Sequence, residues 1–322
     1  MMIAMTINEK KEFVRSTVAD PVLKNNEVLV EVHAAALNRA DLMQRAGNYP
    51  PPPGWPEWPG LEISGVVLDA GNSRKWKKGD KVCALLGGGG YAEKAAVPET
   101  LLMPVPDGVS MIEAAALPEV FATSYLDLKM TGKLEAGETV LIHAGASGLG
   151  LAAIQTAKLL GAKVMTTVGS EEKGKIVKEF GADLVVNRKI DDLARVMEAN
   201  PVNVVMDCVG TGISHCIDKM AFGGRWILIA NLGGDTATIP LAQMYKKNLT
   251  VTGITLRSRP EQVKEFILSE IVKWIWPAIS DGRIRTKIHA VFPLEQAAEA
   301  HGILERNENI GKVVLTTGKA MA

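Results

Sequence analysis

The chain has 322 residues, of which 47% are hydrophobic and 22% are charged, and its 36 basic side chains balance 36 acidic ones. This length predicts about two domains with an ample core. A net charge of zero gives no electrostatic reason to expect a nucleic acid or a membrane as partner. Three cysteines without a CxxC pair argue against a disulfide framework and favour a reducing compartment. Without a secretory pattern or a membrane-spanning apolar run, the sequence predicts a cytoplasmic protein.

The first third of the chain has the pattern of β structure. Residues 27–33 alternate polar and apolar side chains, as a half-buried strand does. Further short strands are expected at 63–68, 81–86 and 91–97, between breaks rich in glycine or proline. The prolines of residues 49–54 fix φ and remove backbone donors, which predicts a stiff surface loop.

From residue 137 the pattern changes to strands that alternate with helices, which predicts a parallel sheet covered by helices. The segment from residue 257 on has two strand candidates of its own. Since a lone strand pair is marginal, we expect this tail to pack on the N-terminal β domain. The expected strands are 139–143, 163–168, 184–186, 202–208, 225–230 and 249–253, and in the tail 287–292 and 312–316; the tail helices are 260–274 and 294–305.

A glycine-rich turn between a strand and a helix is the sharpest local signal. Dinucleotide-binding turns need small residues at the bend, at the pyrophosphate and where the helix packs on the strand. The helix N-terminus then directs backbone N–H groups at the phosphates. The turn consists of Gly145, Ala146, Ser147, Gly148, Leu149 and Gly150.

Two other motifs nearly match this region and are rejected. The turn resembles the nucleophile elbow of hydrolases, but Leu149 stands where that motif needs its closing glycine. Residues 169–175 have the spacing of a P-loop, but Ile176 replaces the hydroxyl residue that would bind magnesium.

The end of the second strand of the alternating region indicates which cofactor binds. An NAD site usually has an acidic side chain about 20 residues after the glycines, but Val168 stands near that distance. Lys173 and Arg188 are candidates to neutralise a 2′-phosphate, whereas Glu171 and Glu172 oppose this unless they face solvent. The sequence therefore favours NADPH, with a phosphate end formed by Gly169, Ser170, Lys173 and Arg188.

Four stretches together resemble a known family: residues 38–45 (NRADLMQR), 49–54, 60–62 and 309–312. With the glycine turn, they make the chain similar to the zinc-independent quinone oxidoreductases of the medium-chain dehydrogenase/reductase superfamily, alongside zeta-crystallin and closest to the tumour-suppressor-induced branch. The resemblance implies an α/β protein with a GroES-like β-rich catalytic domain and a Rossmann domain with a doubly wound parallel sheet. It also implies NADPH-dependent quinone reduction and a homodimer. The expected boundaries are 1–118 with 258–322, and 119–257.

The chain departs from the zinc-dependent members of the superfamily at each ligand position. Asn38 stands where those relatives have cysteine, Leu61 where they have histidine, and Glu119 at the third ligand. An amide and an alkyl side chain cannot replace a thiolate and an imidazole on zinc. The sequence thus predicts no metal. Many family members also have tyrosine where this chain has Arg188.

Without a metal, hydride transfer depends mainly on positioning, which can supply roughly 7–11 kcal/mol of the barrier. We expect a cleft between the domains in which Asn38 or Tyr49 hydrogen-bonds the carbonyl where negative charge develops, with Asp41 as a third candidate. The structural alternatives are a helix cap or turn for Asn38 and Asp41, and packing beside the prolines for Tyr49.

For the cofactor, the resemblance implies contacts from later turns of the Rossmann domain. The acceptor is expected to be a quinone, with an enone as the alternative; a third reading is an NADPH-binding protein with little turnover. Strand 225–230 is a candidate for pairing across subunits. The implied cofactor contacts are Thr123, Asn231, Gly233, Leu256, Arg257 and Asn309.

Overall fold

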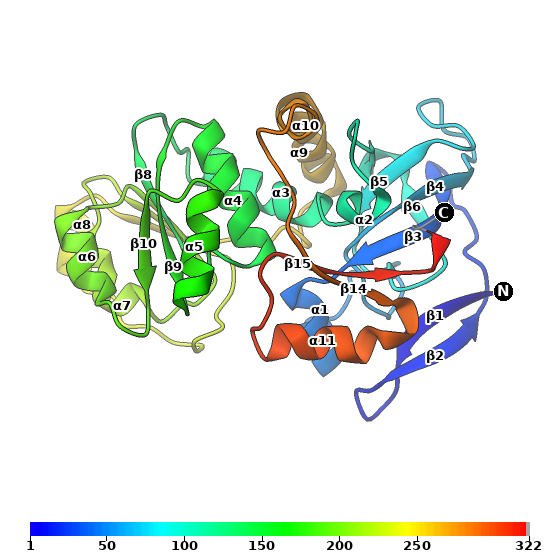
Figure 1. Ribbon diagram of the computed structural model, residues 1–322, viewed down its shortest axis with the longest axis horizontal. Helices are drawn as coiled ribbons and strands as arrows, with labels where there is room; N and C mark the ends of the chain where they lie inside the picture. The colour runs from blue at the N-terminus through cyan, green and yellow to red at the C-terminus, as the bar shows by residue number, and fades with distance from the viewer. Residues whose placement is uncertain (320–322) are drawn as a thin grey trace. The chain divides into compact units, whose positions relative to one another are not determined.

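The computed structural model describes residues 1–319 and contains two compact units, each with its own sheet (Figure 1). One unit joins residues 1–122 to the residues from 257 onward, and the other spans Thr123–Leu256. These boundaries lie within a few residues of those expected from the sequence. Within residues 1–319, no helix is long and apolar enough to cross a membrane.

A seven-stranded sheet is the framework of the first unit, in the order β14-β15-β3-β4-β5-β7 with β6 paired to β3. β3 (Glu27–Ala36) pairs antiparallel with β4, β6 and β15. Its alternate residues Val28, Val30 and Val32 are buried, as the period of two predicts. The other strands are β4 (Glu62–Asp69), β5 (Lys81–Leu85), β6 (Lys94–Pro98), β7 (Leu102–Pro104), β14 (Ile288–Pro293) and β15 (Lys312–Thr316).

A separate hairpin of β1 (Met2–Ile7) and β2 (Phe13–Val18) was not predicted. Its turn lacks the Asn-Gly or Asp-Gly signal of a tight hairpin. Instead the Asn8 side-chain oxygen accepts hydrogen bonds from the backbone N–H groups of Lys10 and Glu12, at 2.9 and 3.0 Å. An Asx turn of this kind leaves only a weak trace in the sequence.

The C-terminal tail completes the first unit, as predicted. β15 pairs antiparallel with β3, and β14 pairs parallel with β15. In addition, the Trp276 indole N–H donates to the backbone oxygen of Pro104 at 2.7 Å. The helices are α1 (Arg39–Ala46), α2 (Met111–Ala114), α3 (Pro118–Ser124), α9 (Glu261–Trp274), α10 (Trp276–Ser280) and α11 (Ala297–Glu305), with short 3-10 turns η1 (Glu99–Leu101) and η4 (Leu294–Gln296).

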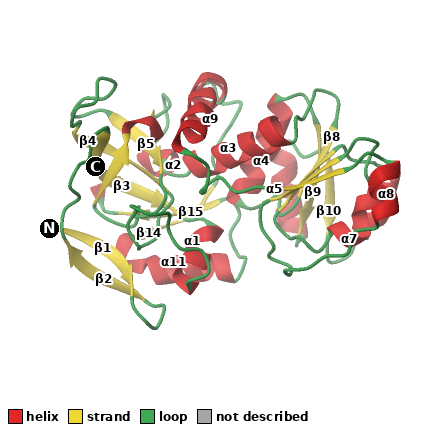
Figure 2. Ribbon diagram, turned by 180° about the vertical axis from the view of Figure 1, so that it is seen from behind, coloured by secondary structure: helices red, strands yellow, loops and turns green. Residues whose placement is uncertain are grey.

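The second unit is a six-stranded sheet in the order β10-β9-β8-β11-β12-β13, and all its strand pairs are parallel. Figure 2 shows its strands β8, β9 and β10. Taken along the chain this is the strand order 3-2-1-4-5-6 of a Rossmann fold. The predicted fold class of this domain is therefore confirmed. The strands are β8 (Thr139–Ile142), β9 (Lys163–Val168), β10 (Leu184–Asn187), β11 (Val204–Asp207), β12 (Arg225–Leu228) and β13 (Thr250–Gly253).

Helices flank this sheet, and one segment of the unit is a π-helix. The helices are α4 (Gly148–Leu159), α5 (Glu171–Glu179), α6 (Leu193–Ala199), α7 (Ile213–Cys216) and α8 (Leu241–Lys246), with the π-helix η2 (Tyr125–Thr131) and the 3-10 turn η3 (Ile217–Lys219).

Two strand predictions need correction. Strand 225–230 was a candidate for pairing across subunits, but β12 lies between β11 and β13, so both of its edges are already used. β13 is the edge strand on that side. The strand expected from residue 91 begins at Lys94, because Tyr91 bonds through its backbone N–H to Pro59 instead.

Candidate functional site

The glycine turn joins β8 to α4 and is held by β9. The backbone N–H of Gly145 donates to Thr167 O at 3.0 Å. Ser147 caps α4, since its hydroxyl accepts from Gly150 N–H at 3.0 Å. Leu151 N–H donates to Ser147 O. The first N–H groups of a helix have no acceptor inside it, so those of Gly148 and Leu149 are directed out of the helix end.

Close packing explains the glycines at the two ends of this turn. A Cβ at Gly145 would lie 2.0 Å from the Thr166 hydroxyl oxygen, which itself donates to Ile142 O at 2.7 Å. A Cβ at Gly150 would lie 2.5 Å from the backbone oxygens of Ala144 and Gly145. The helix therefore begins in direct contact with the strand end, as a dinucleotide-binding turn requires.

The predicted phosphate end of the cofactor site comes together at the end of β9. A Cβ on Gly169 would lie 3.4 Å from a guanidinium nitrogen of Arg188, which is exposed. Ser170 caps α5 by accepting from Lys173 N–H. Burial lowers the pKa of Lys173, and the nearby charge of Arg188 lowers it further. Arg188 thus lies next to Gly169 and close enough to Lys173 for their charges to interact, and the acids Glu171 and Glu172 are both exposed.

His143 and Asp207 were not selected as site residues from the sequence. His143 directly follows β8 and Asp207 ends β11, the strand next to it in the sheet. The Asp207 carboxylate accepts from the backbone N–H groups of Val209 and Gly210 at 2.7 and 3.0 Å, and from the Trp226 indole at 2.9 Å. Burial lowers the pKa of His143, and the Asp207 charge only partly offsets this. His143 is therefore a neutral imidazole next to the turn, and Asp207 holds the loop after β11.

The remaining residues that the resemblance implied as cofactor contacts do not form one cluster within either unit. The Asn231 amide donates to Asp235 in an exposed loop. Gly233 packs on the loop after β11, because its Cβ would lie 2.7 Å from the Thr211 hydroxyl and its N–H donates to Val209 O. Thr123 is half-buried in α3, Leu256 is buried, and Asn309 donates to Gly311 O at 2.9 Å.

In the first unit, half-buried Asn38 contacts a buried ion pair. Its amide oxygen accepts from Lys312 Nζ at 2.9 Å, and its amide nitrogen donates to Glu62 Oε1 at 3.0 Å. Lys312 and Glu62 form a salt bridge of 2.6 Å, with 5% and 0% of their side chains exposed. The other Glu62 oxygen accepts from Glu119 N–H at 2.9 Å. We refer to Asn38, Glu62, Glu119 and Lys312 as the ionic cluster.

Asp41 lies in the first turn of α1, in the capping position expected if its role is structural and not catalytic. Its carboxylate accepts from the backbone N–H groups of Asn38 at 2.7 Å and Gly60 at 3.0 Å, and it is fully buried. Burial raises its pKa to about 6, although these two hydrogen bonds oppose the shift. This geometry favours a role in fixing the start of α1, and a catalytic role for Asp41 stays a prediction.

Glu119 is the strongly perturbed acid of the ionic cluster. Burial, and next the charge of Glu62, raise its pKa from the ordinary 4.5 to about 8. The folded protein therefore binds this proton more tightly than the unfolded chain, so this group's contribution to stability is lost as the pH rises from about 4.5 to about 8. Since glutamine cannot ionise, we expect Glu119→Gln to match the wild type in thermal denaturation near pH 4.5 and to exceed it increasingly up to pH 8. A pH-independent difference would contradict the assignment.

Tyr49 is held by Arg257. The guanidinium lies 4.8 Å from the centre of the Tyr49 ring and donates to Tyr49 O at 3.0 Å. Its other nitrogens donate to Gly87 O at 2.8 Å and to the Gln44 side-chain oxygen at 2.6 Å. Arg257 was expected to contact the cofactor. The structure uses all three of its guanidinium nitrogens within the first unit, while a cofactor contact stays a prediction.

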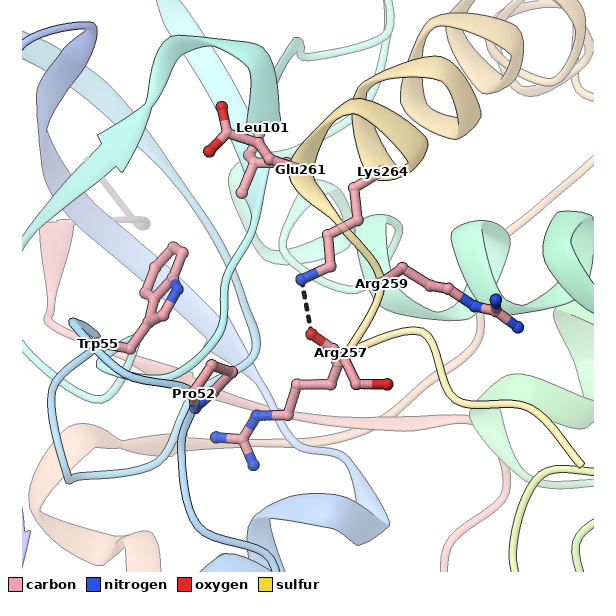
Figure 3. A pocket seen from close by; sticks show the side chains of 8 residues that line it. Pro52, Trp55, Leu101, Arg257, Arg259, Glu261 and Lys264 are labelled. Atoms are coloured by element: carbon pink, nitrogen blue, oxygen red, sulfur yellow. Dashed lines mark hydrogen bonds between the residues drawn. The ribbon is translucent and has the colours of Figure 1, made fainter.

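A hollow of about 200 Å³ adjoins Arg257 in the same unit (Figure 3). Trp55 and Pro52 form one side of it, and Lys264, which is 7% exposed, lies across from them. Lys264 Nζ donates to Arg257 O at 2.7 Å. This bond fixes the chain as it enters α9.

The resemblance assigns Asn38, Leu61 and Glu119 to the positions that hold zinc in zinc-dependent relatives. Leu61 is buried, and Asn38 is engaged with Lys312 and Glu62. Over residues 1–319, no group of three His, Cys, Asp or Glu side chains is arranged to hold a metal ion. Zinc independence stays a prediction.

Known proteins resemble this chain in both sequence and fold. Two family profiles match, the alcohol dehydrogenase GroES-like domain over residues 24–107 and the zinc-binding dehydrogenase over residues 148–273. Quinone oxidoreductase-like protein 2 of Bos taurus is 32% identical and covers 97% of this chain and 91% of its own. The quinone oxidoreductase of Thermus thermophilus, solved also with NADPH, has a TM-score of 0.84 at 30% identity over 98% of this chain and all of its own. An NAD-dependent alcohol dehydrogenase has the same TM-score at 29% identity, covering 98% and 99% of the two chains.

The fold and the turn thus define a two-domain dehydrogenase/reductase with a GroES-like unit and a Rossmann unit. Within that class, the chain belongs to the quinone oxidoreductases of the medium-chain dehydrogenase/reductase superfamily. The resemblance to the quinone oxidoreductases of this superfamily and the fold class inferred from the sequence are both confirmed.

Proposed function

We propose that this protein uses NADPH to reduce quinones by hydride transfer without a bound metal ion. Two neighbouring strand ends support the cofactor half of the proposal. The turn at Gly145 and Gly150 brings the N-terminus of α4 against the sheet, and Arg188 lies beside Gly169 at the next strand end. A helix N-terminus suits a pyrophosphate, and a guanidinium suits a 2′-phosphate. NADPH, when bound, would supply the hydride.

The first unit supplies the groups proposed to face the quinone. Asn38 is half-buried and its amide is held in one orientation by the ionic cluster. Tyr49 is half-buried and held by Arg257. Fixed donors of this kind stabilise negative charge that develops on a carbonyl oxygen. The proton that balances the hydride comes from water.

The reaction is tested by following NADPH oxidation with 1,4-benzoquinone and, separately, with a small enone. Each assay is run with and without a strong chelator. The proposal predicts rapid oxidation with the quinone that the chelator does not change. Faster turnover with the enone would show that enones, and not quinones, are the substrate class. Cofactor binding without turnover of either would make the protein a binding protein. Loss of activity with chelator would overturn the metal-free reaction.

The preference for NADPH is tested at Arg188 and Lys173. Each cation is proposed to bind the 2′-phosphate, and a hydrogen bond to a charged group is worth about 1.5–3 kcal/mol. We therefore expect Arg188→Ala and Lys173→Ala to raise the Kd for NADPH by roughly 10- to 100-fold and to leave that for NADH almost unchanged. Lys175→Ala, an exposed cation on the same helix, is the control. Equal losses for both nucleotides would contradict the assignment.

We also propose a homodimer in a reducing, cytoplasmic compartment. Over residues 1–319, no strand pairs with the outer side of β13, and α8, which precedes it in the chain, exposes Leu241 and Tyr245 at 77% and 69%. An open strand edge beside exposed apolar side chains is a common protein interface. Light scattering should give twice the chain mass, and Tyr245→Asp should lower it. A wild-type monomer would contradict the proposal.

A further inference from the structure

The ammonium group of Lys312 is enclosed by oxygen atoms. It donates to Leu37 O at 2.6 Å, to Asn38 Oδ1 at 2.9 Å and to Glu62 Oε1 at 2.6 Å. A lysine ammonium has three N–H donors, so each has an acceptor. Because only 5% of the Lys312 side chain is exposed, ions from solvent cannot readily take the place of its ammonium group beside these oxygens.

This arrangement permits one orientation of the Asn38 amide. The amide oxygen faces the ammonium, and the amide nitrogen faces the Glu62 carboxylate. Turning the amide over would place N–H groups against a cation and an oxygen against an anion. Its second N–H has only a long contact of 3.5 Å to Ala36 O. That N–H is the donor that the cluster leaves for another acceptor.

Topology explains why residues so far apart in sequence meet here. Lys312 begins β15, Asn38 follows β3, and Glu62 begins β4, and these three strands are neighbours in the sheet. A buried ion pair is itself weak support for stability, since apolar groups of similar size often do as well. The Lys312–Glu62 ion pair also fixes the Asn38 amide, which is a role that apolar groups could not fill.

We infer that Lys312 and Glu62 are positioning residues that fix the Asn38 amide with one N–H directed to the carbonyl oxygen of the acceptor. The inference rests on the proposed function, in which Asn38 contacts that oxygen. A donor held in place before the reaction needs no reorganisation when charge develops. Lys312 thereby acts through Asn38 and touches neither acceptor nor cofactor.

The test compares Asn38→Ala with a double variant that carries both Lys312→Met and Glu62→Gln. This double variant, called the paired variant, removes both charges. Removing both avoids an unpaired buried charge. We expect the paired variant to lower kcat for benzoquinone by roughly 10- to 100-fold, less than the roughly 100- to 1,000-fold loss that follows removal of an oxyanion donor itself. The KM for quinone and the Kd for NADPH should change little. Lys312→Arg alone, which keeps the positive charge, should retain most of kcat. Adding Asn38→Ala to the paired variant should lower kcat little further.

Lys319→Met is the matched control, because Lys319 pairs with Glu31 at an exposed site of the same unit. It should behave as the wild type. A folded paired variant with wild-type kcat, or losses that multiply fully with Asn38→Ala, would overturn the inference. A wild-type enzyme that does not oxidise NADPH with quinone fails the proposed function instead. Unchanged turnover in Asn38→Ala would also overturn the inference, because the amide that Lys312 and Glu62 hold would then have no part in the reaction.

A second measurement serves if the paired variant does not fold. The side-chain amide of Asn38 is identified in the NMR spectrum of the wild type by its loss in Asn38→Ala. Held between a cation and a carboxylate, its two protons should have well-separated shifts and exchange slowly with water. Two averaged, fast-exchanging signals like those of a surface asparagine would overturn the inference.

Discussion

Replacing Gly150 by alanine is expected to lower the affinity for NADPH by roughly 100-fold or more and to destabilise the fold, because overpacking of this kind costs about 1–3 kcal/mol. The added Cβ would lie 2.5 Å from the backbone oxygens of Ala144 and Gly145, and backbone atoms cannot turn aside as a side chain does. The turn must open and move the end of α4, and with it the N–H groups proposed to hold the pyrophosphate.

The measurement is a fluorescence titration with NADPH together with thermal denaturation. Gly253→Ala is the control, because no atom lies within 4 Å of its Cβ and its φ is not in the left-handed region. It should bind NADPH normally. Normal binding by Gly150→Ala would show that the cofactor does not depend on this turn.

Replacing Arg257 by methionine is expected to destabilise the first unit by about 3 kcal/mol or more, since it removes the guanidinium donor from acceptors at Gly87, Gln44 and Tyr49, the first two of which are buried. Loss of the contact with the Tyr49 ring frees the proline loop, so the KM for quinone should also rise. Chemical denaturation and steady-state kinetics measure the two effects.

The control is Arg259→Met, a change in the same chain segment at a half-buried side chain that adjoins the same hollow. It should leave both stability and KM near the wild type. The Kd for NADPH separates two roles of Arg257. An unchanged Kd fits the observed hydrogen bonds, whereas a large rise with normal stability would show a direct cofactor contact.

The sequence contained most of the fold because its patterns are local. The strand at 163–168 and the tail strand at 312–316 were predicted with the bounds observed, since both are short apolar runs between clear breaks. The first hairpin was missed because an Asn8 side chain, not a glycine, makes its turn. The error at strand 225–230 was of another kind, since no local pattern tells an edge strand from an inner one.

The candidate site was only partly visible in the sequence. The turn and the cations Lys173 and Arg188 have a recognisable spacing, and the structure brings the cations together. Lys312 and Glu62 are 250 residues apart, so only the sheet order could show their contact. Asp207 offered one signal, an acid at the end of a buried strand, which by itself fits many structural roles.

The proposed function depends most on a reduced pyridine nucleotide bound across the turn at Gly145–Gly150. Calorimetric titration of the wild-type protein with NADPH and with NADH tests this directly. We predict tight binding of one NADPH per chain and clearly weaker binding of NADH. No heat of binding with either nucleotide would contradict the account, and tighter binding of NADH would contradict the role given to Arg188.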